Sequence, residues 1–167
     1  MLQQTQVKTV IPYFENFVKK IPNLKILSAS SEKKILKLWE GLGYYRRAKN
    51  LHKTSKILIN SYNGKIPNSF IELKKMPGIG DYTANVLLAL IYNQPRIGID
   101  GNVKRILLRL FNVNFFDLTN LFKIKRNADF AEALMEFGAL ICKPKDPKCY
   151  ECSFKKKCLY NKSQHKT

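Results

Sequence analysis

Four residues near the middle of the chain, Pro77-Gly78-Ile79-Gly80, restrict what the surrounding sequence can form. They cannot continue a helix, because proline lacks a backbone donor and both glycines accept positive φ angles. From Thr83 onward the sequence is apolar with a helical period, which predicts a tight turn followed by a new helix. Such a turn directs backbone N–H groups outward at a positive helix N-terminus. It is either an anion site, with nucleic-acid phosphate as the expected anion, or a plain helix–turn–helix corner that binds nothing.

The net charge of the chain favours the anion site. The sequence has 167 residues and a formal net charge of +18, from 30 lysines and arginines against 12 aspartates and glutamates. An excess of that size predicts attraction to a polyanion, with an affinity that falls as the salt concentration rises. A lysine bias in the gene is the alternative source of the charge. Because aromatic residues and glycines accompany the lysines, a nucleic-acid partner is the preferred interpretation.

Hydropathy argues against a membrane protein. The longest apolar run, from Val86 to Tyr92, is far shorter than a membrane span. Met1 leads into Leu-Gln-Gln-Thr-Gln, which is not a secretory signal. We therefore expect no membrane association and an intracellular location, in the cytoplasm or nucleoid, where structural disulfides are disfavoured.

The predicted fold class is all-α, because the chain shows helical periods and no convincing alternation of period two. Proline, glycine and capping residues divide it into segments. Leu51 is expected on the inner face of the long helix, Asn63-Gly64 at its end and Ser69 at the start of the next. Helices are expected over residues 7–21, 31–39, 45–62, 69–75, 83–92, 102–110 and 127–142, with 112–126 irregular or weakly helical.

Four cysteines, Cys142, Cys149, Cys152 and Cys158, have the spacing C-x6-C-x2-C-x5-C. Four thiolates this close can surround one metal centre. Zinc sites usually pair two C-x2-C units, whereas this run has one, so a [4Fe-4S] cluster is preferred over zinc and over free thiols. The lysines around the run indicate that this loop also meets a phosphate backbone.

The Pro-Gly-Ile-Gly turn, the aspartate that follows it at Asp100 and the cysteine spacing together resemble the helix–hairpin–helix DNA glycosylases of the endonuclease III superfamily. Within that superfamily, MLQQTQV (1–7), WEGLGYY (39–45) and IDGNVKR (99–105) resemble the adenine glycosylase branch. The resemblance covers essentially the whole chain. It implies an all-α, two-lobed fold, with a helical barrel lobe over 1–98 that contains the helix–hairpin–helix motif at about 74–92, and an iron–sulfur lobe over 99–167.

The resemblance also implies a function. Enzymes of this branch remove adenine mispaired with 8-oxoguanine or guanine from double-stranded DNA, and a monomer is expected here. Because the glycosidic bond is inaccessible inside a stacked duplex, the nucleotide must be flipped out. Gln4 and Tyr44 match family residues that insert into the base stack around the mismatch, and Gln3 lines the same segment. The alternative for Tyr44 is a core aromatic residue beside Gly43.

Asp100 matches the catalytic aspartate of the superfamily, whose carboxylate stabilises the oxocarbenium character that develops on the sugar. Its position alone also makes it an N-cap for the following helix, and the two roles are compatible. At position 82 the endonuclease III branch has a lysine that forms a Schiff base and permits backbone cleavage. Tyr82 stands there in this chain, so a monofunctional glycosylase is implied. Lys104 and Arg105, like the turn at 77–80, are expected to contact phosphates.

Both ends depart from the family pattern. The family protonates adenine with a glutamate two residues before the methionine that begins this chain. A chain that starts at this methionine lacks that acid and is expected to have lost most of the catalytic rate. A fragment or a misassigned start is the preferred explanation, and a shortened gene product is the alternative. The family's C-terminal module, which reads 8-oxoguanine, is likewise expected to be missing.

Two further functions stay open on the sequence alone. A sister branch that removes thymine from T·G mispairs shares the tyrosine at the hairpin, the cysteine spacing and a short tail after the last cysteine. The strings Leu-Gln-Gln-Thr-Gln and Asp-Gly-Asn-Val-Lys-Arg argue against that branch. A DNA-binding remnant without catalytic activity is the third alternative.

Overall fold

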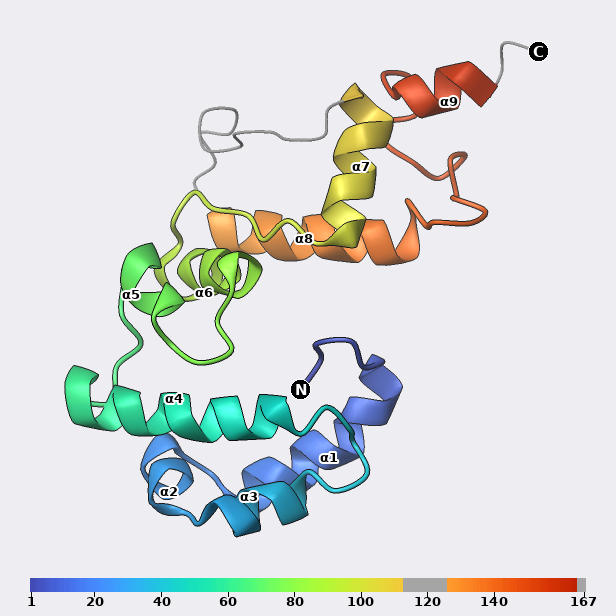
Figure 1. The fold of residues 1–167 in the computed structure, drawn as a ribbon. Coiled ribbons are helices and arrows are strands. Elements are labelled where there is room, and N and C mark those ends of the chain that lie inside the picture. Colours follow the sequence, from blue (N-terminus) through green and yellow to red (C-terminus); the bar gives the residue numbers. More distant parts are fainter. Residues whose placement is uncertain (113–125, 165–167) are drawn as a thin grey trace. The chain divides into compact units, whose positions relative to one another are not determined.

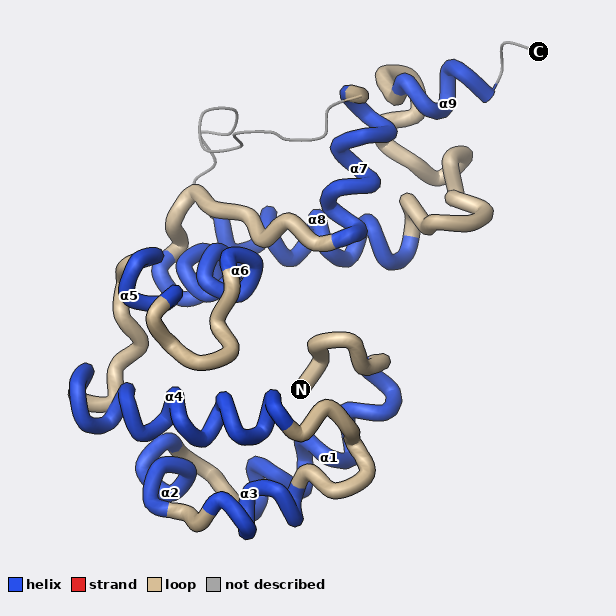
Figure 2. Tube along the Cα trace, in the orientation of Figure 1, coloured by secondary structure: helices blue, strands red, loops and turns tan. Residues whose placement is uncertain are grey.

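A computed structural model describes residues 1–112 and 126–164, which form helices and no strand (Figures 1 and 2). The predicted all-α fold class is confirmed for this part of the chain. Apart from its two ends, the stretch expected to be irregular lies outside the described residues. In chain order the helices are α1 (Val7–Lys20), α2 (Leu24–Ala29), α3 (Glu32–Leu38), α4 (Arg46–Tyr62), α5 (Phe70–Lys74), α6 (Asp81–Tyr92), α7 (Gly101–Phe111), α8 (Asn127–Leu140) and α9 (Leu159–Gln164).

The chain divides into two compact units, residues 1–79, here the N-terminal unit, and residues 80–167, the C-terminal unit. The first carries α1 to α5 and the second α6 to α9. The lobe boundary expected between residues 98 and 99 stays a prediction. None of the helices in the described ranges has the length and apolar character needed to cross a bilayer.

The core of the N-terminal unit lies between α1, α3 and the turn that follows α3. In that core, α4 packs on α2 and α3, and α1 packs on α3 (Figure 1). Phe17 meets Trp39 edge-on with ring centroids 6.2 Å apart, a favoured aromatic geometry. The buried cluster comprises Val10, Phe17, Ile21, Leu27, Ile35, Trp39, Leu42 and Ala48.

Helix ends in this unit follow the capping chemistry of the sequence. Asn63 ends α4 in the left-handed conformation with φ +51°, as predicted. The Ser69 hydroxyl accepts a hydrogen bond from the Glu72 N–H at 3.5 Å and begins α5, also as predicted. Helix α2 was not predicted, although Asn23 caps it by accepting from the Ile26 N–H at 2.9 Å. Its six residues are too few for an apolar period to show.

The prediction that Leu51 faces inward is wrong, since this side chain is 39% exposed. The buried residues of α4 include Ala48, His52, Ser55 and Leu58, which follow one another at three- and four-residue spacing. That stripe runs beside Leu51. Two short polar residues and a histidine lie on the buried side because α2 and α3 pack there, which the hydropathy pattern does not reveal.

In the C-terminal unit, α8 packs against both α6 and α7, and α7 also packs against α9 (Figure 1). Val103 and Leu107 are buried between these helices. The helices α7 and α8 approach closely at Gly138, where a Cβ would lie 2.7 Å from the Cβ of Asn102 and 3.1 Å from the Cδ1 of Ile106. A side chain at position 138 would therefore force the two helices apart.

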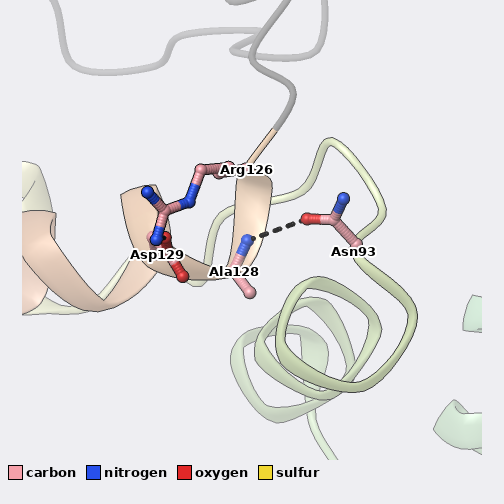
Figure 3. Close-up of polar contacts among 4 residues, drawn as sticks. All are labelled: Asn93, Arg126, Ala128 and Asp129. Atoms are coloured by element: carbon pink, nitrogen blue, oxygen red, sulfur yellow. Dashed lines mark hydrogen bonds and ion pairs between the residues drawn. The ribbon is translucent and has the colours of Figure 1, made fainter.

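A polar joint connects the end of α6 to the start of α8 (Figure 3). Asn93 ends α6 with φ +50°, and its side-chain Oδ1 accepts from the Ala128 N–H at 3.2 Å. Its backbone carbonyl accepts from the Asn127 side-chain amide at 2.7 Å. Arg126 forms an ion pair with Asp129 at the same helix start. The first turn of α8 thus takes a hydrogen-bond acceptor from the end of another helix.

Candidate functional site

The Pro-Gly-Ile-Gly turn forms where the sequence predicts it. Gly78 has φ +80°, and a Cβ at this position would lie 2.9 Å from the Cβ of Asn50. The Pro77 carbonyl accepts a hydrogen bond from the Thr54 hydroxyl at 2.9 Å, which ties the turn to α4. Both the backbone conformation and the space beside α4 therefore require glycine at position 78.

Helix α6 begins directly after this turn, at Asp81, with Gly80 as its N-cap in an extended conformation. Because glycine has no side chain, Gly80 contributes only its backbone carbonyl, which accepts from the Ala84 N–H at 2.9 Å. The Ile79 N–H is used within the turn, where it donates to the Met76 carbonyl at 3.1 Å. Phosphate binding by Pro77, Gly78, Ile79 and Gly80 stays a prediction, and the first turn of α6 also carries the acidic side chain of Asp81.

Asp100 and Tyr82, the two residues predicted for the catalytic site, belong to the same unit. Asp100 is the N-cap of α7, with Oδ1 accepting from the Val103 N–H at 2.8 Å and Oδ2 from the Asn102 amide at 3.2 Å. The capping role is therefore confirmed. Burial, and after it the charge of Asp100, raise the pKa of Tyr82 above its ordinary value of 10.0. The Tyr82 phenol is thus protonated at neutral pH and within electrostatic reach of the Asp100 carboxylate.

The position of Tyr82 is fixed on two sides. Its hydroxyl donates to the sulfur of Met135 at 3.2 Å. Its ring packs on the backbone at Gly98, where a Cβ would lie 2.8 Å from Cε2 of the ring. Neither contact was foreseen, since residues 98 and 135 carry no local signal for an approach to residue 82.

The segments that carry Gln4 and Tyr44 meet in the N-terminal unit. Tyr44 is 62% exposed, so the alternative that it is a core aromatic residue is wrong. The guanidinium of Arg47 donates to the carbonyl of Gln3 at 2.6 Å and to that of Gly43 at 3.2 Å, which joins the two segments. This arginine was not predicted, because nothing in the local sequence pattern separates it from its neighbour Arg46.

Lys104 and Arg105, the basic pair after Asp100, have different surroundings in the structure. Lys104 is exposed on α7. The guanidinium of Arg105 donates from Nε to the Cys142 carbonyl and from Nη2 to the Gly138 carbonyl and the Asn102 side chain, all at 2.8 Å. Arg105 therefore holds the end of α8 against α7. Phosphate contact by the pair stays a prediction.

All four cysteines line one pocket, together with Arg109 and Tyr160. Burial, and then the other three thiols, raise the pKa of Cys149, whereas Arg109 lowers it. Arg109 donates to the sulfur of Cys142 at 3.6 Å, and the Cys158 thiol donates to the Arg109 carbonyl at 3.3 Å. Among the described residues, no three His, Cys, Asp or Glu side chains stand close enough to hold one metal ion.

Comparison with known proteins defines the class of this fold. The family model described as "HhH-GPD superfamily base excision DNA repair protein" matches residues 1–126, which is most of the chain. The protein belongs to the HhH-GPD superfamily, and the superfamily resemblance seen in the sequence is confirmed.

Individual relatives show which glycosylases the chain is similar to. The chain is 45% identical to "Adenine DNA glycosylase" of Buchnera aphidicola subsp. Baizongia pistaciae (strain Bp), over 95% of this chain and 48% of that protein. It thus spans about half the length of this relative. Among solved structures it resembles a thermostable thymine-DNA glycosylase, with TM-score 0.86, 25% identity and coverage of 97% and 80% of the two chains. A non-covalent endonuclease III–DNA complex matches with TM-score 0.80, 26% identity and coverage of 99% and 82%.

Proposed function

We propose that this protein is a monofunctional adenine DNA glycosylase that hydrolyses the N-glycosidic bond of adenine mispaired with 8-oxoguanine or guanine in double-stranded DNA, as a monomer in the compartment that holds the genome. The observation that carries the chemistry is the carboxylate of Asp100, which two hydrogen bonds orient and which lies in the same unit as Tyr82. The 45% identity to an adenine DNA glycosylase supports the choice of base.

Asp100 is suited to stabilise positive charge on a sugar. Hydrogen bonds to both of its oxygens, from the Val103 N–H and the Asn102 amide, fix the orientation of the carboxylate. As the bond to the base breaks, the sugar gains oxocarbenium character, and a fixed carboxylate lowers the energy of that state. Tyr82 has no amine with which to form a Schiff base, so hydrolysis leaves the DNA backbone intact.

The DNA contacts of this proposal come from three places. The turn at 77–80 binds phosphate through its backbone, and Lys104 with Arg105 adds positive charge beside Asp100. Gln4 and Tyr44, with Gln3 next to them, enter the base stack at the mismatch. The exposure of Tyr44 supports this role, because an exposed aromatic ring on a glycine-rich segment is available to a base.

The pocket lined by the four cysteines is the proposed place of an iron–sulfur cluster, whose binding would have to draw the thiols closer together than they stand in this structure. Its lining holds four thiols on one loop, near enough to raise the pKa of Cys149 together. Ligation needs thiolates, and the positive charge of bound iron would add to the compensation that Arg109 supplies. Cys142, Cys149, Cys152 and Cys158 would hold a [4Fe-4S] cluster, which when bound contributes folding free energy to the loop. A zinc ion in the same pocket is the alternative, and iron and zinc analysis of the purified protein separates the two.

A binding experiment tests the choice of substrate. Affinities are measured for otherwise identical duplexes that contain A·8-oxoguanine, T·G or only matched pairs, and single-turnover excision is followed on each. We expect the tightest binding and any excision at adenine opposite 8-oxoguanine. The test variant is Tyr44→Ala, and the matched duplex is its control. This variant should reduce the preference for the mispair and leave the affinity for the matched duplex unchanged. Preference for T·G would refute the adenine assignment, and equal affinity for all three duplexes would refute mismatch recognition.

The second candidate is removal of thymine from T·G mispairs. The observation in its favour is the structural similarity to a thermostable thymine-DNA glycosylase over 97% of this chain. The adenine assignment has the higher sequence identity on its side, 45% against 25%. The same set of duplexes decides between the two, because a thymine glycosylase would bind and cleave only the T·G duplex.

A further inference from the structure

Arg47, in the first turn of α4, reaches two segments that are separate in the sequence. On one side, Nη1 donates to the carbonyls of Met1 and Gln3. On the other side, Nη2 donates to the carbonyls of Leu42 and Gly43, at 3.4 and 3.2 Å. One guanidinium thus holds the start of the chain and the turn before α4 together.

The same guanidinium lies between two aromatic rings. Its Cζ is 5.5 Å from the centroid of Trp39 and 5.3 Å from the centroid of Tyr44. Trp39 is buried and donates from Nε1 to the Gly43 carbonyl at 3.1 Å, the carbonyl that Arg47 also binds. The exposed ring of Tyr44 therefore has one face directed at a fixed cation, which restricts its orientation.

The carbonyls that Arg47 binds have particular places in the backbone. The Gln3 carbonyl belongs to the peptide unit that leads into Gln4, and the Gly43 carbonyl to the unit that leads into Tyr44. Gln4 and Tyr44 both have left-handed φ angles, +58° and +48°. Residues other than glycine occupy this region at an energetic cost and persist there only where their surroundings fix them. Arg47 binds the peptide immediately before each of the two strained residues.

We infer that Arg47 is a positioning residue that holds Gln4 and Tyr44 in the backbone conformations in which they enter the DNA stack. What these two residues do on DNA rests on the proposed function. Arginine suits this task because its planar fork places donors on two nitrogens with fixed geometry. A lysine ammonium carries its donors on one atom and cannot span both segments.

The first arm of the test needs no DNA. The variants are Arg47→Met, which keeps the length of the side chain, Arg47→Lys, which keeps the charge, and Arg46→Met, a control that removes a neighbouring exposed charge. Amide hydrogen exchange is measured over residues 1–6 and 41–45, together with acrylamide quenching of Trp39, the single tryptophan, which is 1% exposed. In Arg47→Met we expect exchange about tenfold faster in both segments, as loss of several charged hydrogen bonds implies. Arg47→Lys should lie between this variant and the wild type, and Arg46→Met should match the wild type.

The second arm measures recognition as a ratio of two affinities, for the A·8-oxoguanine duplex and for the matched duplex. We expect Arg47→Met to lower this ratio about tenfold, because Gln4 and Tyr44, once displaced, no longer favour the mispair. Its affinity for the matched duplex should fall no more than that of Arg46→Met, since each variant loses one positive charge. If Arg47→Met does not fold, as judged by circular dichroism, Arg47→Lys carries both arms.

The outcomes separate this inference from the proposed function. If the wild type prefers the mispair and the Arg47 variants prefer it equally, the inference is refuted and the function stands. Faster exchange in both segments with an unchanged ratio also refutes it, because the contacts would then be structural only. A wild type that does not distinguish the mispair refutes the proposed function, and the positioning role with it.

Discussion

Asp100 caps α7, and the proposed function gives its carboxylate a second role, the stabilisation of positive charge on the sugar. Two substitutions separate these roles. Asp100→Asn keeps a side-chain oxygen that accepts from the Val103 N–H, since asparagine is among the best N-cap residues, but removes the negative charge. Asp100→Ala removes the acceptor and the charge together. The two variants should therefore differ in stability and agree in their loss of excision.

The size of the stability difference follows from the contacts. Loss of a good N-cap costs about 1 kcal/mol of unfolding free energy, with a range of roughly 0.5–2 kcal/mol. In this protein the Val103 bond is 2.8 Å long and a second bond joins Asp100 to Asn102. Asparagine keeps the Val103 bond but loses the Asn102 bond, because its amide nitrogen cannot accept. We therefore expect Asp100→Ala to cost about 1.5 kcal/mol and Asp100→Asn about 0.5 kcal/mol.

Guanidinium unfolding followed by circular dichroism measures the first quantity, and single-turnover excision on the A·8-oxoguanine duplex measures the second. A third readout is the pKa of Tyr82, followed by ultraviolet absorbance of the phenolate with Tyr82→Phe as the blank. Because the Asp100 charge is one of the two causes that raise this pKa, both Asp100 variants should lower it toward 10.0.

Two results would contradict this reasoning. Equal destabilisation by asparagine and alanine would show that the hydrogen bond to Val103 does not support α7. Excision at the wild-type rate by Asp100→Asn would remove Asp100 from the catalytic assignment, whatever its effect on stability.

Three further changes test other parts of the structure. Gly78→Val, which forces φ +80° on a β-branched residue beside Asn50, should weaken binding to every duplex alike, because we expect the turn to contact phosphate; weaker binding to the mispair alone, measured by fluorescence anisotropy, would contradict this. The raised pKa of Tyr82 contributes stability that is complete below pH 10 and is lost as the pH rises through the raised value, so Tyr82→Phe should flatten the alkaline decline of the unfolding free energy; parallel pH curves would argue against it. Arg109→Met removes the hydrogen bond to the Cys142 sulfur and should lower the iron content per chain; unchanged iron would show that the pocket holds its metal without that arginine.

The helix ends that the sequence predicts are those that depend on short-range chemistry. Asn63, Ser69 and Asp100 each act on a backbone group within a few residues, so their roles can be inferred from spacing alone. The face that a helix buries depends on its packing partners. This is why Leu51 was misplaced and the six-residue helix α2 was overlooked.

Within the candidate site, too, the sequence predicts what depends on residues close together along the chain and not what depends on the fold. The cysteine run could be predicted because its members are close in sequence, and they line one pocket in the structure. The sequence names Arg105 only as a phosphate contact and does not single out Arg47, because the carbonyls that their guanidinium groups bind include Gln3 and Cys142, which lie far from them along the chain. A local pattern shows an arginine as a charge, and only the folded chain shows which carbonyl groups it reaches.

The way in which α8 is anchored has a consequence for engineering. Asn93 binds the opening turn of that helix through its side-chain oxygen and its own carbonyl, so one residue at the end of α6 fixes the place at which α8 begins. Asn93 is consequently a position to leave unchanged when this half of the protein is redesigned.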